Sequence, residues 1–194
     1  MNTLIIIAHP NKKSFSHILA YDYKIEKEKS WHTIRIIDLY DDQWQQHYLN
    51  MNETNRTLED PLRNIHQELI TWSDEICFFF PLWRFDCPAI LKNWFDVNYT
   101  NGFAYKYRSG KAIPEKLLQN KWVRVFVTTW WPRRLYKTIG RCIRCIITVP
   151  RLLWRIDYVG MKLKSRNRFT DMNNIRLPEE RERMRRKVRS IANK

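Results

Sequence analysis

Short apolar runs alternate along this chain with stretches whose apolar residues recur at helical spacing. The runs at 4–8 and 76–80 contain no polar residue, which is typical of strands buried on both faces. Segment 59–74 places apolar residues mostly three or four positions apart, as an amphipathic helix does. The pattern predicts strands at 3–8, 31–39, 75–80, 121–129 and 158–169, and helices within 14–24, 59–74, 88–96 and 178–192.

The order of these elements predicts the fold class. Strand and helix alternate from the start of the chain, and strand–helix–strand units require right-handed crossovers between parallel strands. We therefore expect an α/β protein whose parallel sheet carries helices on both faces. The length of 194 residues is that of one domain, 1–194. Ligands of such sheets bind outside the carboxyl ends of the strands.

Two prolines bracket an aromatic loop that follows the third predicted strand. Pro81 and Pro88 disfavour helix at the residues before them, and Pro88 can itself open a helix at its first position. The loop then lies between a strand end and a helix start, where a ligand would bind. The alternative interpretation is a hydrophobic loop that packs on its own helix.

A second candidate site follows the first predicted strand. Residues 9–14 form a turn, and Ser14 can cap the helix that comes next, whose free N–H groups attract anions. The chain contains neither GxGxxG nor GxxxxGK, which argues against a dinucleotide fingerprint and a Walker phosphate loop. The alternative for His9 is a solvent-exposed turn histidine.

The run from Pro81 to Asp96, followed by Gly102-Phe-Ala-Tyr105, closely resembles the flavodoxin-like NAD(P)H:quinone oxidoreductase family of quinone reductases and modulators of drug activity. Ala8-His9-Pro10 and Ser14-Phe15-Ser16 also match that family, where it receives the phosphate and ribityl chain of the flavin. The resemblance implies a flavodoxin-like α/β fold with a five-stranded parallel sheet in the order 2-1-3-4-5. It also implies a homodimer.

The resemblance further implies the chemistry. One FMN, in preference to FAD, would accept a hydride from NAD(P)H and pass the electrons to a quinone-like small molecule by ping-pong kinetics, with no metal. Tyr136 aligns with a tyrosine that assists hydride transfer in some members. The residues that would bind the cofactor are His9, Ser14, Phe15, Ser16, Pro81, Leu82, Trp83, Arg84, Phe85, Thr128, Thr129 and Trp130.

Three departures from the family pattern bear on this activity. Trp130 and Trp131 stand where the family has small residues that let the backbone approach the flavin, and glycine permits such an approach because it has no Cβ. Arg84 replaces an aromatic residue. The histidine that assists the tyrosine is missing, since every histidine of the chain lies before residue 70. Hydride chemistry belongs mainly to the flavin, so this last loss tunes the enzyme without abolishing it.

Charge is spread unevenly. Residues 1–100 hold 10 basic and 14 acidic side chains, whereas residues 101–194 hold 25 basic and 6 acidic ones. Segment 133–155 is basic and amphipathic, which fits either a helix with a solvated face or a peripheral contact with anionic lipid. The alternative function is therefore a flavin-free relative that acts as a basic interaction subunit at a membrane-associated partner. Nucleic-acid binding is disfavoured because no recognition motif accompanies the charge.

The cellular compartment follows from two absences in the sequence. The run at 4–8 is too short for a signal-peptide core, and no apolar segment reaches the ~18 residues of a membrane span. Cys142-x-x-Cys145 lacks a second ligand pair at zinc spacing, so we expect no metal site and four reduced cysteines. We predict a soluble, cytoplasmic protein.

Overall fold

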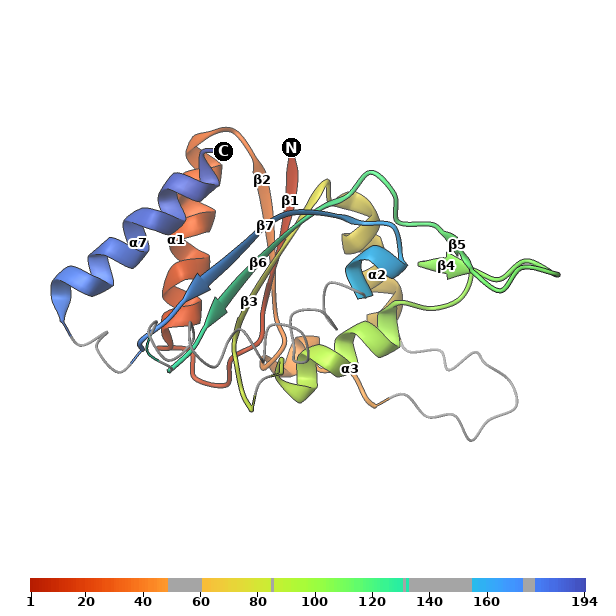
Figure 1. Ribbon diagram of the computed structural model, residues 1–194, viewed down its shortest axis with the longest axis horizontal. Helices are drawn as coiled ribbons and strands as arrows, with labels where there is room; N and C mark the ends of the chain where they lie inside the picture. Colours follow the sequence, from red (N-terminus) through yellow and green to blue (C-terminus); the bar gives the residue numbers. More distant parts are fainter. Residues whose placement is uncertain (49–60, 85, 131, 133–154, 173–176) are drawn as a thin grey trace.

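The computed structural model describes residues 1–48, 61–84, 86–130, 132, 155–172 and 177–194. Within these ranges five parallel strands form one sheet in the order β2-β1-β3-β6-β7 (Figure 1). This is the order 2-1-3-4-5 counted along the chain, so the predicted flavodoxin-like α/β class is confirmed. The strands are β1 (Asn2–Ile7), β2 (Thr33–Asp38), β3 (Glu75–Pro81), β6 (Trp122–Thr128) and β7 (Lys162–Phe169).

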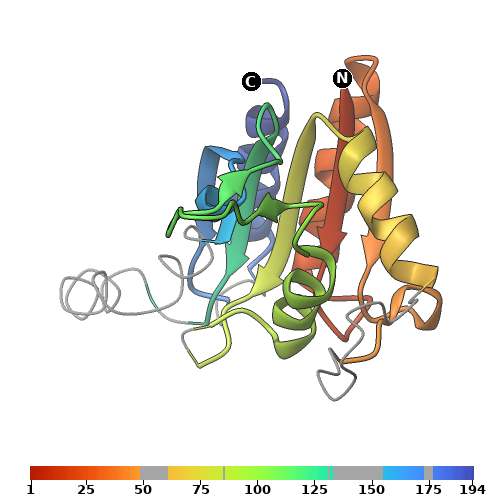
Figure 2. The ribbon, with the colours of Figure 1, turned by 90° about the vertical axis from the view of Figure 1, so that its right-hand side faces the viewer.

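Helices cover both faces of the sheet, as predicted (Figures 1 and 2). Helices α1 (Phe15–Lys29) and α7 (Pro178–Ala192) lie side by side on one face. Helices α2 (Pro61–Trp72) and α3 (Ala89–Asn98) cover the other face. No described helix is a candidate for a membrane-spanning segment.

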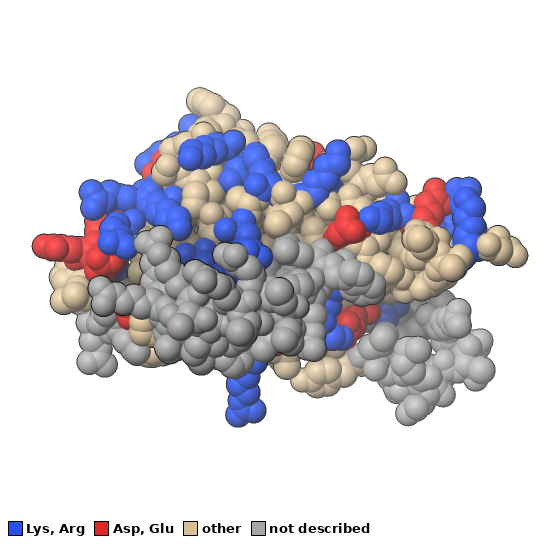
Figure 3. All heavy atoms as spheres, viewed as in Figure 1, with Lys and Arg blue, Asp and Glu red and all other residues tan. Residues whose placement is uncertain are grey.

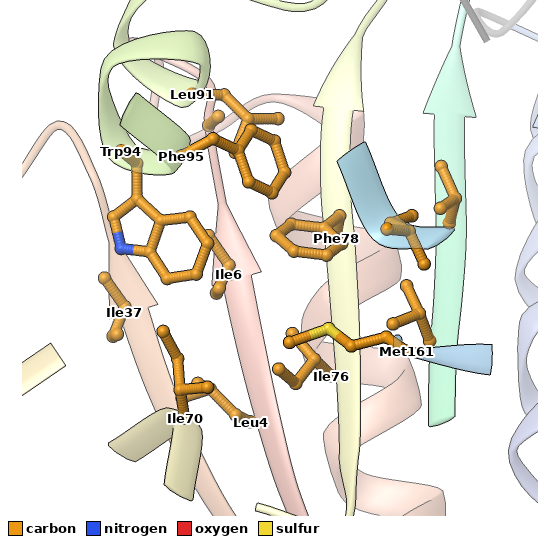
Figure 4. Close-up of a cluster of buried hydrophobic side chains, with 14 of the residues drawn as sticks. Leu4, Ile6, Ile37, Ile70, Ile76, Phe78, Leu91, Trp94, Phe95 and Met161 are labelled. Atoms are coloured by element: carbon orange, nitrogen blue, oxygen red, sulfur yellow. The ribbon is translucent and has the colours of Figure 1, made fainter. Parts of the chain in front are cut away.

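Two apolar clusters bury the sheet. Successive residues of a strand point to opposite faces, so Leu4 and Ile6 of β1 join the cluster under α2 and α3, together with Phe78 (Figure 4). Ile5 and Ile7 join the cluster under α1 and α7. The unbroken apolar runs in the sequence follow from this burial on both sides.

Local signals set the starts of two helices as predicted, and a third differs by one residue. Ser14 Oγ accepts the His17 N–H, so Ser14 caps α1. Pro178 opens α7. Pro88 is the residue before α3 and not its first residue. Its backbone is extended, with ψ 145°, while its carbonyl already accepts the N–H groups of Leu91 and Lys92.

Three short elements differ from the prediction. A hairpin of β4 (Tyr105–Lys106) and β5 (Glu115–Lys116) forms where the pattern predicts no element, because two-residue strands are too short to show a period. A 3₁₀ turn, η1 (Asp42–Trp44), follows β2, where the pattern also predicts no element. Residues 155–158 are helical, so β7 begins later than residue 158. The predicted basic helix at 133–155 lies outside the described residues except for Arg155.

A buried carboxylate joins α1, β3 and β6 at the amino-terminal edge of the sheet. Glu75 is fully buried and accepts hydrogen bonds from Tyr23 Oη at 2.9 Å and from Arg124 Nε at 2.7 Å. Lys27 Nζ lies 3.4 Å away and Lys164 Nζ 3.6 Å away. Since Lys27 and Arg124 are themselves buried, Glu75 is the counterion that allows both cations to stay inside.

Glu75→Gln should lower the free energy of unfolding by about 3–5 kcal/mol, because two buried cations would lose their counterion. Urea unfolding measures the change. Glu28→Gln is the matched control, since it breaks only an exposed pair with Lys24 and should cost less than about 1 kcal/mol. Equal costs for the two substitutions would contradict the assignment.

The same pair of variants tests the pH dependence. Burial favours the neutral form of Glu75, but Arg124 and Lys27 outweigh burial and lower the pKa of this carboxyl. The stabilisation is therefore present above the unfolded-state pKa of about 4.3 and is lost as the pH falls through the folded-state pKa. The difference in stability between wild type and Glu75→Gln should shrink on acidification.

Candidate functional site

Three loops meet at the carboxyl edge of the sheet. Ala8 N–H donates to Phe79 O at 2.9 Å, which joins the turn after β1 to the end of β3. Leu82 N–H donates to Thr128 O at 2.8 Å, which joins the loop after β3 to the end of β6. The parallel register therefore brings together the segments 8–14, 81–88 and 128–130, as the sequence predicts (Figure 1).

The start of α1 presents donors suited to an anion. The backbone N–H groups of Phe15 and Ser16 make no hydrogen bond to any residue that the structure describes. Such unpaired N–H groups carry the positive end of the helix dipole and bind phosphate. The side chain of Phe15 packs into the cluster under α1 and α7 and so anchors the turn. The chemistry of this donor set fits a phosphate group.

A carboxylate at the end of β2 holds the 9–14 turn in place. Asp38 Oδ2 lies 2.6 Å from Lys12 Nζ and 2.8 Å from His17 Nε2, and Lys12 also bonds to Asp41. Burial favours the neutral form of Asp38, but the hydrogen bonds from His17 and Lys12 outweigh it and lower the pKa of Asp38. Asp38 therefore remains ionised and holds the 9–14 turn against the sheet.

His9 lies beside this cluster as a neutral imidazole. Burial, with the neighbouring His17 as a second cause, lowers the pKa of His9. Its Nδ1 accepts the N–H of Asn11 at 3.0 Å, so the ring hydrogen sits on Nε2 and is free to be donated. The His9 ring also contacts the Trp83 ring at a centroid distance of 6.1 Å. The His9 ring is thus partly buried against Trp83, whereas the alternative interpretation expected a solvent-exposed turn histidine.

The ends of α1 and β6 are tied together by a buried hydroxyl pair. Ser16 Oγ and Thr128 Oγ1 lie 3.1 Å apart, although the two residues are 112 positions apart in sequence. Thr129 is also buried, and its N–H donates to Phe169 O of β7. Thr128, a predicted site residue at the end of β6, thus contacts the start of α1.

The loop after β3 is a tight turn with a strained residue. Trp83 and Asp86 exchange both backbone hydrogen bonds, at 3.0 and 2.8 Å. Arg84 lies between them at φ 48°, in the left-handed region that non-glycine residues rarely adopt. Its side chain is exposed and forms no ion pair with any described residue.

A cavity of about 650 Å³ opens next to this turn, within the range of small-molecule pockets. Trp83 and Trp130 line it and are 38% and 59% exposed, so both indoles offer free ring surface. Trp130 therefore stands at the wall of the hollow and does not fill it. The other lining residues are Leu82, Arg84, Cys87, Pro88 and Ala89.

Several predicted residues fall elsewhere or outside the described chain. Pro81 is buried as the last residue of β3, so it supports the loop and does not line the cavity. Phe85, Trp131 and Tyr136 lie outside the described residues. Within the described ranges no cluster of His, Cys, Asp or Glu could hold a metal ion.

Sequence reasoning missed His17, Asp38 and Lys12. Their hydrogen bonds join positions 21 and 26 residues apart. One signal was available, since Asp38 ends the second strand and carboxyl ends of neighbouring parallel strands share one edge.

Comparison with known proteins identifies the family of the chain. The model of a family described as having a flavodoxin-like fold matches residues 1–144, and the chain belongs to that family.

Two of the similar proteins are named as enzymes that use NAD(P)H. An uncharacterized NAD(P)H oxidoreductase of Haemophilus influenzae is 32% identical over 144 residues, which cover 72% of this chain and 70% of that protein. NAD(P)H dehydrogenase [quinone] 1 of Cavia porcellus is 28% identical over 71% of this chain, but only 56% of its own length is matched. The chain is thus similar to quinone reductases over most of its residues.

A solved structure shows the same fold. The FMN-dependent NADH-azoreductase of Bacillus anthracis, in complex with FMN, superposes with a TM-score of 0.76 at 18% identity, covering 99% of this chain and 97% of that one. At this identity the likeness establishes the fold alone.

The Ser16–Thr128 contact can be measured by a double-mutant cycle. Ser16→Ala and Thr128→Val should couple by about 0.5–1.5 kcal/mol in unfolding free energy, because each removes the same buried hydrogen bond. Ser16→Ala combined with Thr71→Val, a threonine on exposed α2 surface, should be additive. Additivity of the first pair would show that the two hydroxyls do not interact.

Proposed function

We propose that this protein is an FMN-dependent NAD(P)H oxidoreductase that reduces quinones or similar planar acceptors. The observation that carries the proposal is the pairing of an anion-binding helix start with an aromatic-walled cavity, which Trp83 links through its contact with His9. A phosphate-tailed planar cofactor needs both parts at one edge of the sheet. The flavin complex of the B. anthracis azoreductase and the quinone specificity named for the C. porcellus relative support it.

Different residues would bind the phosphate end and the ring of the cofactor. The N–H groups of Phe15 and Ser16, with the Ser14 hydroxyl and His9 Nε2–H, would hold the phosphate end. Leu82, Trp83 and Trp130 would flank the ring, exclude water from it and orient it. A bound flavin would accept hydride from NAD(P)H and pass the electrons on to the acceptor.

Other parts of the proposal stay predictions. Tyr136 is proposed to assist hydride transfer, and Thr128 and Thr129 to lie beside the ring. A homodimer is proposed from the resemblance to the quinone reductases, and a cytoplasmic location from the apolar pattern of the sequence. Because one cavity would serve both substrates, NAD(P)H and the acceptor would enter in turn.

The proposal predicts that purified protein takes up one FMN per chain and oxidises NADH or NADPH when a quinone is added. Absorbance titration measures uptake, and loss of nicotinamide absorbance measures turnover. FMN uptake without turnover would limit the proposal to flavin binding. Failure to take up FMN across neutral pH would overturn it.

Trp130→Gly should weaken FMN binding about 3- to 10-fold, since an indole stacked on an aromatic ring contributes about 0.5–1.5 kcal/mol. Quenching of FMN fluorescence gives the dissociation constants. Trp31→Gly is the matched control, because Trp31 is 94% exposed and has φ 61°, which glycine adopts freely. Tighter binding by Trp130→Gly would show that the indole obstructs the ring.

A basic surface favours one alternative function, a flavin-free interaction subunit at an anionic, membrane-associated partner. Lys162, Lys164 and Arg166 are exposed along the edge strand β7. Lysine and arginine side chains gather on the same side over α7 (Figure 3). Sedimentation with anionic vesicles, together with absence of FMN uptake, would favour this alternative. Charged side chains on an edge strand also prevent sheet-to-sheet aggregation, and so do not require a partner.

A further inference from the structure

We propose that Arg84 makes the cavity selective for planar aromatic acceptors that carry an anionic group, a sulfonate or a carboxylate, on the ring. In naming an acceptor the inference rests on the proposed function, because it concerns the same cavity. Binding of an anionic ring beside Arg84 can be tested without flavin and without turnover. The family of the chain does not require this preference, since Arg84 stands where the family pattern has an aromatic residue.

The turn after β3 places two neighbouring residues at the same cavity. Successive residues of an extended segment face opposite sides, yet Trp83 and Arg84 both line the cavity. Arg84 adopts φ 48°, and Trp83 and Asp86 close the turn around it by exchanging both backbone hydrogen bonds. The left-handed backbone therefore matters for the site, because it brings a cation next to an exposed indole.

The Arg84 guanidinium has no carboxylate partner among the described residues. Its side chain is exposed, and Asp86, the acid of the same turn, accepts the N–H of Cys87 with Oδ1 at 2.8 Å. Arg185, by contrast, donates two hydrogen bonds to Asp22. A guanidinium is always charged in proteins and presents five N–H donors in a planar fork. That fork matches the paired oxygens of an acidic group on a ligand.

Among the described residues, Arg84 is the one charged side chain that lines the cavity. The other lining residues are apolar, apart from the thiol of Cys87. Burial, with the neighbouring Asp86 as a second cause, raises the pKa of Cys87 to about 11, so the thiol is neutral near neutral pH. The described wall of the cavity is therefore positive. A ring with an anionic group gains an ion pair there, which a neutral ring does not.

The two indoles set the second requirement, which is a planar ring. Trp83 and Trp130 are both exposed at the cavity wall, and aromatic rings pack favourably against indoles. A small inorganic anion has no ring to pack, and a neutral quinone has no charge to pair. The wall therefore fits a planar aromatic anion better than either. The pyrophosphate of NAD(P)H shares the anionic chemistry, so the experiment has to separate these two sources.

Calorimetry on the purified full chain measures the preference without flavin. The two probes are naphthalene-2-sulfonate and 2-naphthol, which share one ring system and differ in charge near neutral pH. The sulfonate should bind more tightly than the naphthol. The ratio of the two dissociation constants should approach one as salt is added, because salt screens an exposed ion pair. A sulfonate preference that salt leaves unchanged would overturn the proposal, and that test needs no variant.

Two substitutions separate the charge of Arg84 from the strain of its backbone. Arg84→Gln removes the cation and should lower the sulfonate preference about 3- to 10-fold, as expected for an ion pair that is open to water on one side. Arg84→Lys keeps the charge without the fork and should retain part of the preference. Both replacements carry a Cβ, so both keep the left-handed strain.

Arg181→Gln is the matched control. Arg181 is exposed on α7 and does not line the cavity, so its replacement changes the net charge equally and should leave the sulfonate preference unchanged. Thermal unfolding checks that each variant is folded. A loss of preference in Arg181→Gln as large as in Arg84→Gln would show that net charge, and not Arg84, attracts the sulfonate, and would overturn the proposal.

Turnover by FMN-loaded protein tests the assignment to the acceptor. Naphthoquinone and its sulfonate differ in intrinsic reactivity, so the readout is the ratio of their kcat/KM values, compared between wild type and variant. Arg84→Gln should lower this ratio about 3- to 10-fold in disfavour of the sulfonate. A rise in the KM for NAD(P)H with an unchanged acceptor ratio would assign the cation to the pyrophosphate and overturn the proposal.

The outcomes separate this inference from the proposed function. If FMN binds and quinones are reduced, but Arg84→Gln leaves both ratios unchanged, Arg84 does not select the acceptor and the oxidoreductase proposal stands. If FMN does not bind, and Arg84→Gln still loses the sulfonate preference, the oxidoreductase proposal falls and the cavity remains a site for planar anions. A folded Arg84→Gln variant that keeps the wild-type preference overturns the inference in either case.

Discussion

Burial of β1, β3 and β6 on both faces is the constraint from which the rest of the structure follows. Parallel strands covered by helices on each side have no solvent face, so their middle residues must be apolar. Apart from Arg124, which pairs with Glu75, the polar groups of these strands lie at or next to the strand ends. Function is therefore confined to the ends as well, and the parallel register decides which ends meet.

The two edges of the sheet differ in how their polar groups are paired. At the amino edge, Lys27 and Arg124 lie in the interior and both pair with Glu75, which joins α1, β3 and β6. At the carboxyl edge the N–H groups of Phe15 and Ser16 stay without partners among the described residues. The ion pairs at the amino edge stabilise the fold, whereas the unpaired backbone N–H groups at the carboxyl edge can bind an anion.

The sequence predicted the sheet better than the site, for physical reasons. Period and length identify a buried strand or a long helix from neighbouring residues alone, which is why the order of the sheet and the bounds of α7 were right. The hairpin β4–β5 is fixed by pairing across eight residues and carries no periodic signal. The Ser14–His17–Asp38 chain was missed because it depends on two strands and a helix start meeting in space.

The sequence raised the question of whether Trp130 blocks the pocket expected from the family resemblance, and the structure shows where its indole lies. Two tryptophans and an arginine replace small and aromatic residues around the expected ring, which reads from sequence as a blocked pocket. In the structure the Trp130 indole stands at the wall, the left-handed backbone of Arg84 turns the loop back on itself, and about 650 Å³ stays open between them. A left-handed arginine costs about 1–2 kcal/mol and is held by the paired backbone bonds of Trp83 and Asp86. Strain of this kind persists where the surrounding structure imposes it, and here it shapes the rim of a cavity that Trp83 and Trp130 line.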